Sequence, residues 1–477
     1  MSEFPKRRRL ASAICCIALI IAAAAASARG VSPYLPMRMA PEIEREIERL
    51  LSMAGMPILK KPYFAADIQE ALRRSCSSGE PVCNHVRLYL DRYFYQAGFT
   101  HASAAIASGD EASKFVPNQR GMQVDSRYNG SVQAYWQPGA NLLLTGSAVA
   151  FEGEVIPTAL ISFGYDVAQV DIGWREYWWS PFRDSATVIS SNARPSPSIA
   201  ISNYRPLTFL NFRYETFFAV LEETDGILYQ GERSPGQPRL FGLHLEIEPL
   251  PGFSLGLNRV MQFGGDGRSS SLSTLLRAFF DPAGGDNADG DLSSDDEAGN
   301  QLASITSRFD YPGKFPFSVY MEYAGEDTSS SENFRLGNAA LSVGFFLPKV
   351  TQNIDITYEF SDFQNGWYVN GIYANGYTND GSVIGHWVGN ERQFGDAVGT
   401  QANTLILNWE FNPGNLLHVT YRTVNNADYS SVDYVRGHEL LLRYSHGLGN
   451  FITGVEIYGG RTTLDDQFAT IGGFLRW

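Results

Sequence analysis

The segment whose residue types are best suited to chemistry is residues 365–387, NGWYVNGIYANGYTNDGSVIGHW. It interleaves aromatic rings with polar side chains: Trp367, Tyr368, Tyr373, Tyr377 and Trp387 with Asn365, Asn370, Asn375, Asn379 and His386. Flat aromatic faces can stack on the C–H side of a sugar ring, and amide groups can bond adjacent hydroxyls. The composition therefore predicts carbohydrate binding, with the alternative that the same rings pack an ordered loop.

The candidate contacts divide by chemistry. The stacking rings are Trp367, Tyr368, Tyr373 and Trp387, and the hydroxyl partners are Asn365, Asn370, Asn379, His386 and Glu326. An acidic glycan would also need cationic partners, because charged donors form the strongest hydrogen bonds to a carboxylate. Arg335 and Arg392 are the candidates for that role.

Other residue patterns point only weakly to catalysis or metal binding. Glycoside hydrolysis needs two carboxyl groups about 5 to 9.5 Å apart. Glu322, Glu326 and Asp327 could supply them, but carboxylates are common in any wet barrel lumen. Residues 281–300 are rich in aspartate without matching the EF-hand pattern, so we interpret them as a solvated acidic loop, with Ca²⁺ binding as the alternative. No nucleophile elbow, zinc-protease motif or P-loop is present, and we expect no cofactor or bound metal.

The composition restricts the class of protein. A net charge of −14 argues against nucleic acid as a partner, since nucleic-acid binding requires a basic face. Charged residues make up only 18% of the chain, while aromatic residues reach 13% and there are 46 glycines. This mixture favours a β-protein over a helical enzyme.

The N-terminus predicts export. Residues 6–9 are basic, residues 10–26 form an apolar run, and Ala28 ends a small-residue cleavage site. We therefore interpret residues 1–28 as a secretory signal peptide, with a retained membrane anchor as the alternative. No later segment is long and apolar enough for a spanning helix, so a membrane location would require strands.

Three amphipathic helices are predicted next. Residues 41–54, 62–74 and 81–96 each place apolar side chains on one helical face. Together they form a small helical bundle, which with a connector occupies residues 29–118.

Two cysteines lie between the second and third of these helices. Cys76 and Cys83 enclose a short loop in a chain predicted to enter an oxidising compartment, so we expect a disulfide. The alternative is a metal pair, but only His85 is nearby to complete such a site.

From residue 119 to 477 the apolar pattern has period two. Segments such as residues 317–323, 354–360 and 417–422 alternate apolar with polar or charged side chains. A soluble sandwich also alternates, but here the apolar side is often aromatic, as at a membrane interface. The aromatic residues in question are Trp136, Trp174, Trp409, Tyr421 and the terminal Trp477. At roughly 20 residues per strand and connection, this region predicts a large antiparallel transmembrane β-barrel of about 18 strands.

Long stretches of the barrel region resemble the capsule assembly protein Wzi family. They are residues 202–219 (SNYRPLTFLNFRYETFFA), 238–249 (PRLFGLHLEIEP), 309–329 (FDYPGKFPFSVYMEYAGEDTS), 364–387 and 394–399 (FGDAVG). The N-terminal helices are also similar in kind to the periplasmic-side bundle of that family.

The resemblance implies a non-enzymatic protein of the outer membrane whose barrel is occluded by helices and loops. It further implies a lectin-like role, in which the protein binds exported capsular polysaccharide and organises it on the cell surface. We expect a monomer surrounded by outer-membrane lipid. The alternatives are a porin or saccharide channel and, less in keeping with the resemblance, a glycan hydrolase.

Overall fold

A computed structural model describes residues 30–76, 81–109, 113–265, 267–280, 299–326 and 336–477. The predicted signal peptide, Arg335 and almost all of the acidic loop lie outside the described residues. The account below concerns the described ranges.

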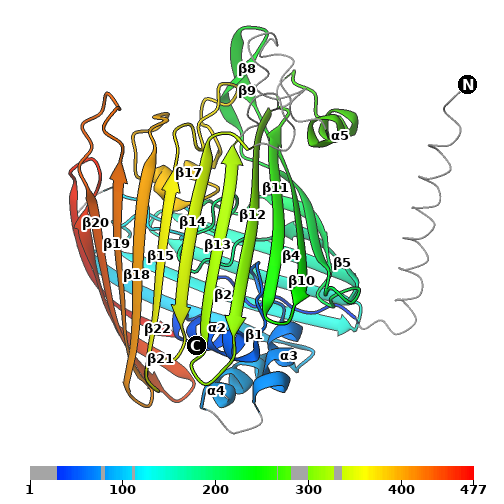
Figure 1. The fold of residues 1–477 in the computed structure, drawn as a ribbon, viewed down its shortest axis with the longest axis vertical. Helices are drawn as coiled ribbons and strands as arrows, with labels where there is room; N and C mark the ends of the chain where they lie inside the picture. Colours follow the sequence, from blue (N-terminus) through cyan, green and yellow to red (C-terminus); the bar gives the residue numbers. More distant parts are fainter. Residues whose placement is uncertain (1–29, 77–80, 110–112, 266, 281–298, 327–335) are drawn as a thin grey trace, which may run out of the picture.

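Eighteen strands form one closed antiparallel barrel (Figure 1). Each barrel strand pairs with the next one along the chain, and β1 also pairs with β22, which closes the sheet. The strands are β1 (Ala97–Gly109), β2 (Tyr128–Gly139), β3 (Leu142–Phe151), β4 (Glu154–Tyr165), β5 (Ala168–Trp174), β6 (Pro197–Ser202), β7 (Arg213–Val220), β10 (Arg239–Leu250), β11 (Phe253–Phe263), β12 (Gly299–Tyr311), β13 (Phe317–Glu326), β14 (Ala339–Leu347), β15 (Ile354–Phe363), β18 (Thr400–Asn412), β19 (Asn415–Asn426), β20 (Gly437–Leu448), β21 (Phe451–Arg461) and β22 (Gln467–Arg476). The predicted barrel of about 18 strands is confirmed.

The two faces of the barrel differ as the period-two pattern requires. In β13, Val319 and Met321 are exposed on the outside, whereas Ser318 and Glu322 are buried inside. Large aromatic side chains are exposed on the outside as well, among them Trp136, Trp174, Trp409 and Tyr421. An apolar outer face with aromatic residues and a polar inner face is the arrangement that a lipid bilayer requires.

The two ends of the barrel also differ (Figure 1). One end has tight turns, in which Gly252 and Gly414 adopt φ of +79° and +77°, a conformation that glycine tolerates. The other end carries the long connections, with the elements β8 (Thr224–Tyr229), β9 (Glu232–Gly236), α5 (Leu272–Phe280), β16 (Thr378–Asn379), β17 (Ser382–Val383) and the 3₁₀ helix η3 (Trp387–Asn390). In the described part of the chain, every helix is too short or too polar to cross a membrane.

A helical bundle lies at the tight-turn end, beside the C-terminus (Figure 1). It consists of α2 (Pro41–Ala54), α3 (Ala65–Ser75), α4 (Pro81–Leu90) and the 3₁₀ turn η1 (Asp91–Tyr93). Apolar side chains including Ile47, Leu50, Ile68 and Val86 form its core. The disulfide between Cys76 and Cys83 is present, as predicted.

The barrel begins earlier than the sequence analysis placed it. Strand β1 starts at Ala97, inside the region 29–118 that we assigned to the bundle and its connector. The reason is the composition of β1, AGFTHASAAIASG, in which small side chains dominate both faces. Alanine and serine give little hydrophobic contrast, so the alternation that marks the other strands is weak here.

The lumen is filled from the tight-turn end by residues 30–64. The Nζ atom of Lys60 lies 3.0 Å from a carboxylate oxygen of Glu215 on β7. From α2, Arg45 Nε lies 2.5 Å from a carboxylate oxygen of Asp355 on β15. These contacts hold the segment against opposite parts of the inner wall.

A second segment, residues 175–196 between β5 and β6, enters the lumen from the long-loop end, and we call it the descending segment. It meets the first segment where the backbone N–H groups of Lys61 and Trp178 donate to each other's carbonyls, at 2.8 and 3.1 Å. Its own rings, Trp179 among them, join an apolar cluster inside the barrel. The chain therefore occludes its own lumen from both ends.

Glu48 illustrates how buried charge holds the N-terminal segment in place. The side chain lies on α2 and is 1% exposed, with Lys61 Nζ at 3.2 Å and Arg308 of β12 at 3.4 Å. Burial alone would raise the pKa of this carboxyl, but the two cations and a hydrogen bond from Tyr63 lower it to about 2. A carboxyl whose pKa is lowered stabilises the fold above its ordinary value of about 4.5, and that contribution is lost as the pH falls through the lowered value.

We therefore expect Glu48→Gln to destabilise the docked N-terminal segment by about 3 kcal/mol at neutral pH, because two buried cations, Lys61 and Arg308, each lose one of their two carboxylate partners. The loss should shrink as the pH falls toward about 2, where the native carboxyl is itself protonated. Thermal unfolding and limited proteolysis in detergent measure this. Glu70→Gln, an exposed change on α3, is the matched control and should shift stability by well under 1 kcal/mol; equal effects of the two variants would contradict the argument.

Candidate functional site

Residues 364–399, between β15 and β18, contain most of the predicted sugar contacts and lie inside the mouth of the barrel. Trp367, Tyr368, Tyr373 and Trp387 are at most 3% exposed. Three of these rings belong to the cluster that also contains Trp179 of the descending segment. Their faces are covered by protein, which favours the packing alternative for them.

Hydrogen bonds fix these rings to the descending segment. Tyr368 Oη donates to the Thr187 carbonyl at 2.6 Å, and Trp387 Nε1 donates to Asp184 at 3.1 Å. The Asp184 carboxylate in turn pairs with Arg422 of β19 at 2.6 Å. The aromatic residues therefore join the two segments that close the long-loop end.

The predicted polar contacts are also used internally. Asn379 donates to the Arg194 carbonyl at 3.0 Å, and His386 Nδ1 accepts from the Val388 N–H at 3.2 Å, capping η3. Arg392 donates to two backbone carbonyls, and Asn370 accepts from two backbone N–H groups.

Glu326 and Asn365 lie in contrasting environments. Glu326 is buried at the end of β13, where it accepts hydrogen bonds from Asn300 at 3.0 Å and from the backbone N–H of Tyr368 at 2.6 Å. Asn365 is exposed, whereas of the other predicted amide contacts Asn370 is partly exposed and Asn379 is buried. Sugar contact by the full predicted set remains a prediction.

The structure brings together a second group of residues that the sequence analysis did not select. We call Phe394, Asp396, Tyr429, Ser430 and Tyr434 the rim cluster; it joins the connection before β18 to the one after β19. Phe394 is 62% and Tyr429 64% exposed. The only sequence signal was the turn-rich stretch FGDAVG, noted for its resemblance and not for its chemistry.

The rim cluster is ordered by short hydrogen bonds. Ser430 Oγ and Tyr434 Oη both donate to one carboxylate oxygen of Asp396, each at 2.7 Å. The hydroxyl of Tyr429 accepts from the backbone N–H of Gly399 at 2.8 Å. Partial desolvation would raise the pKa of Asp396, but the hydrogen bonds from Ser430 and Tyr434 lower it below its ordinary value. The rim cluster thus combines an ionised acceptor with two exposed rings, which suits it to hydroxyl groups and sugar faces.

The fold and the filled lumen define an outer-membrane β-barrel whose interior is occupied by its own chain. The chain belongs to the capsule assembly protein Wzi family, whose model matches residues 117–457.

Three individual proteins are similar to this chain, and the first of them shares its fold. Wzi of Escherichia coli, described as an outer membrane protein involved in group 1 capsule assembly and a carbohydrate-binding β-barrel, superposes with a TM-score of 0.66 at 16% identity, over 94% of this chain and 99% of that one. OprD of Pseudomonas aeruginosa gives 0.47 at 9% identity, over 80% of this chain and 93% of that one. An uncharacterized 55.8 kDa protein in the cps region of Klebsiella pneumoniae is 35% identical over 104 residues, 21% of this chain and 19% of the relative. This alignment thus spans less than a fifth of the relative's length.

If the buried rings join the two closing segments, Trp387→Ala should destabilise the long-loop end by about 3 to 5 kcal/mol, because it leaves a cavity. Thermal unfolding and protease sensitivity of residues 364–399 measure the effect. Phe394→Ala is the matched control, since an exposed ring should change stability by about 0.5 kcal/mol or less. If Trp387→Ala were as stable as Phe394→Ala, the Trp387 ring would have no role in packing.

Proposed function

We propose that this protein is a non-enzymatic lectin of the outer membrane, which binds exported capsular polysaccharide at the long-loop end and holds it on the cell surface. The observation that carries the proposal is the rim cluster, which combines two exposed rings with an ionised carboxylate on an occluded barrel. Membership of a capsule assembly family supports the choice of ligand. The description of the Escherichia coli protein as carbohydrate binding agrees with it.

In this proposal the outermost residues make the contacts. Phe394 and Tyr429 stack on sugar rings, while Asp396 and Asn365 bond hydroxyl groups. The buried residues of 364–399, such as Trp387, act indirectly by fixing the loop that presents them. Each contact is weak, so retention of a long polymer relies on avidity, with one chain touching many monomeric copies in the membrane.

The alternatives receive less support from the same geometry. The carboxylates considered for hydrolysis are buried: Glu322 accepts from Ser180 at 2.8 Å, and Glu326 is held as described above. Asp327 lies outside the described residues. A diffusion channel would need a continuous water path through the lumen. Residues 30–64 and 175–196 contact each other inside that lumen, which disfavours such a path.

The central test compares cells that lack the gene with cells that express variants of it. Deletion should leave polysaccharide synthesis unchanged while moving capsule from the cell-bound to the released fraction. Phe394→Ala combined with Tyr429→Ala should reproduce that release and weaken binding of purified polysaccharide about tenfold, a change of about 1.4 kcal/mol. Leu464→Ala, another exposed apolar side chain at the same end, is the matched control and should retain capsule.

Two outcomes would contradict the proposal. Release of reducing ends from purified capsule would indicate a hydrolase. A steady open conductance of the wild-type protein in planar bilayers would indicate a channel.

A further inference from the structure

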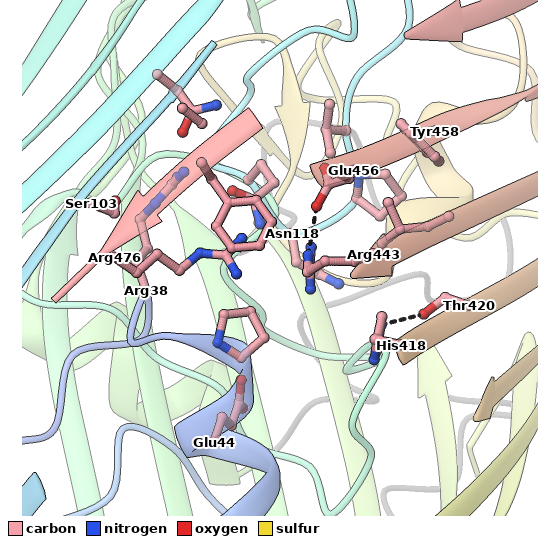
Figure 2. A pocket seen from close by; sticks show the side chains of 18 of the residues that line it. Arg38, Glu44, Ser103, Asn118, His418, Thr420, Arg443, Glu456, Tyr458 and Arg476 are labelled. Atoms are coloured by element: carbon pink, nitrogen blue, oxygen red, sulfur yellow. Dashed lines mark hydrogen bonds and ion pairs between the residues drawn. The ribbon is translucent and has the colours of Figure 1, made fainter. Parts of the chain in front are cut away.

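A cavity of about 350 Å³ remains inside the filled lumen. It lies between the inner faces of β1 and β18 to β22, residues 37–45 at the start of α2, and the descending segment (Figure 2). Cavities of 300 Å³ and above are large enough for small organic ligands. The cavity is separate from the rim cluster, none of whose residues line it.

The wall of the cavity carries an excess of positive charge. Seven Arg or Lys side chains line it, against three Asp or Glu side chains. Five of these seven cations pair with a carboxylate, as Arg443 does with Glu456 at 2.6 Å and Arg476 with Glu42 at 2.9 Å. Within the described residues, the uncompensated positive charge of the cavity therefore comes from Arg38 and Arg183.

Arg38 is the cation that stands out. Throughout the described ranges it has no carboxylate partner, and its Nη1 atom is buried without a hydrogen-bond acceptor. Burial and the neighbouring Arg120 lower the pKa of Arg38 to about 10, although Glu176 acts in the opposite direction. The guanidinium therefore remains charged at neutral pH. The Arg38 side chain as a whole is only partly buried and lines the cavity, so an anion there would supply the negative partner that it lacks.

Hydroxyl and imidazole groups face the same space (Figure 2). Ser131 Oγ lies 2.6 Å from His101 Nε2 and 2.7 Å from Ser103 Oγ, forming a polar row on β1 and β2. On the opposite wall Thr420 Oγ1 lies 2.8 Å from His418 Nε2. These groups can exchange hydrogen bonds with a hydroxylated ligand as well as with water.

From the cavity, its excess of cations and the unused donor of Arg38, we infer that the lumen holds a binding site for a small hydroxylated anion. The ligand class is a sugar that carries a carboxylate or a phosphate, with Arg38 bonding the anionic group and the serine and threonine hydroxyls contacting the ring substituents. This site is distinct from the proposed polymer contact at the rim, and each can fail without the other.

The test is calorimetric titration of the detergent-solubilised full-length protein with glucuronate, glucose 6-phosphate and glucose. Glucuronate or glucose 6-phosphate should bind, with affinity that falls as salt is added, and neutral glucose should bind at least about tenfold more weakly. Comparison of glucuronate with glucose 6-phosphate shows whether the site prefers a carboxylate or a phosphate. Failure of both anions to bind, or equal binding of glucose, would overturn the inference.

Arg38→Met should reduce anion affinity about tenfold or more without unfolding the protein, because it removes a charge that no carboxylate of the described residues pairs with. Arg38→Lys should retain part of the affinity, since it keeps the charge but not the planar fork of donors. Arg73→Met, an exposed change on α3, is the matched control and should bind as wild type. If Arg38→Met still binds the anions as wild type does, the lumen site is excluded. The variant that combines Phe394→Ala with Tyr429→Ala should lose polymer binding and keep anion binding.

Discussion

The whole structure depends on the requirement that every backbone N–H and C=O group exposed to lipid be paired within the sheet. A sheet with free edge strands leaves backbone groups unpaired, so the first and last strands of the barrel must pair with each other. They do so from Ser103 opposite Arg476 to Gly109 opposite Thr470. Once the sheet is closed, period-two alternation divides each strand into a lipid side and a lumen side, and polar side chains are confined to the interior.

Confinement of polar groups creates the second constraint, because charged side chains inside a filled barrel need partners. The N-terminal and descending segments supply them, as Lys60 does for Glu215 and Asp184 does for Arg422. The same two segments therefore close the lumen and supply the partners of its buried charges. The lumen cavity is where this pairing is incomplete, and the long-loop rim is where ordered polar groups and exposed rings meet solvent.

Local patterns were enough to predict the barrel, the helices and the disulfide. Pro41 and the glycine after Ala54 set the ends of α2, and the spacing of Cys76 and Cys83 suited a bond within one short loop. The start of strand β1 was misplaced because its small residues give little periodic contrast, and helix α5 was missed because its nine residues span too few turns to establish a helical period. The candidate site was harder, since aromatic and amide residues look the same in sequence whether they meet sugar or protein. The burial of Trp387 depends on Asp184, some two hundred positions away in the chain.

The position of residues 30–64 has a consequence for biogenesis. This segment is made before any strand, yet its partners include Asp355 on β15 and Arg308 on β12, which emerge much later. It can complete these contacts only after β12 and β15 have joined the wall. Filling of the lumen is therefore a late step of assembly, in which an early part of the polypeptide waits for the strands that will enclose it.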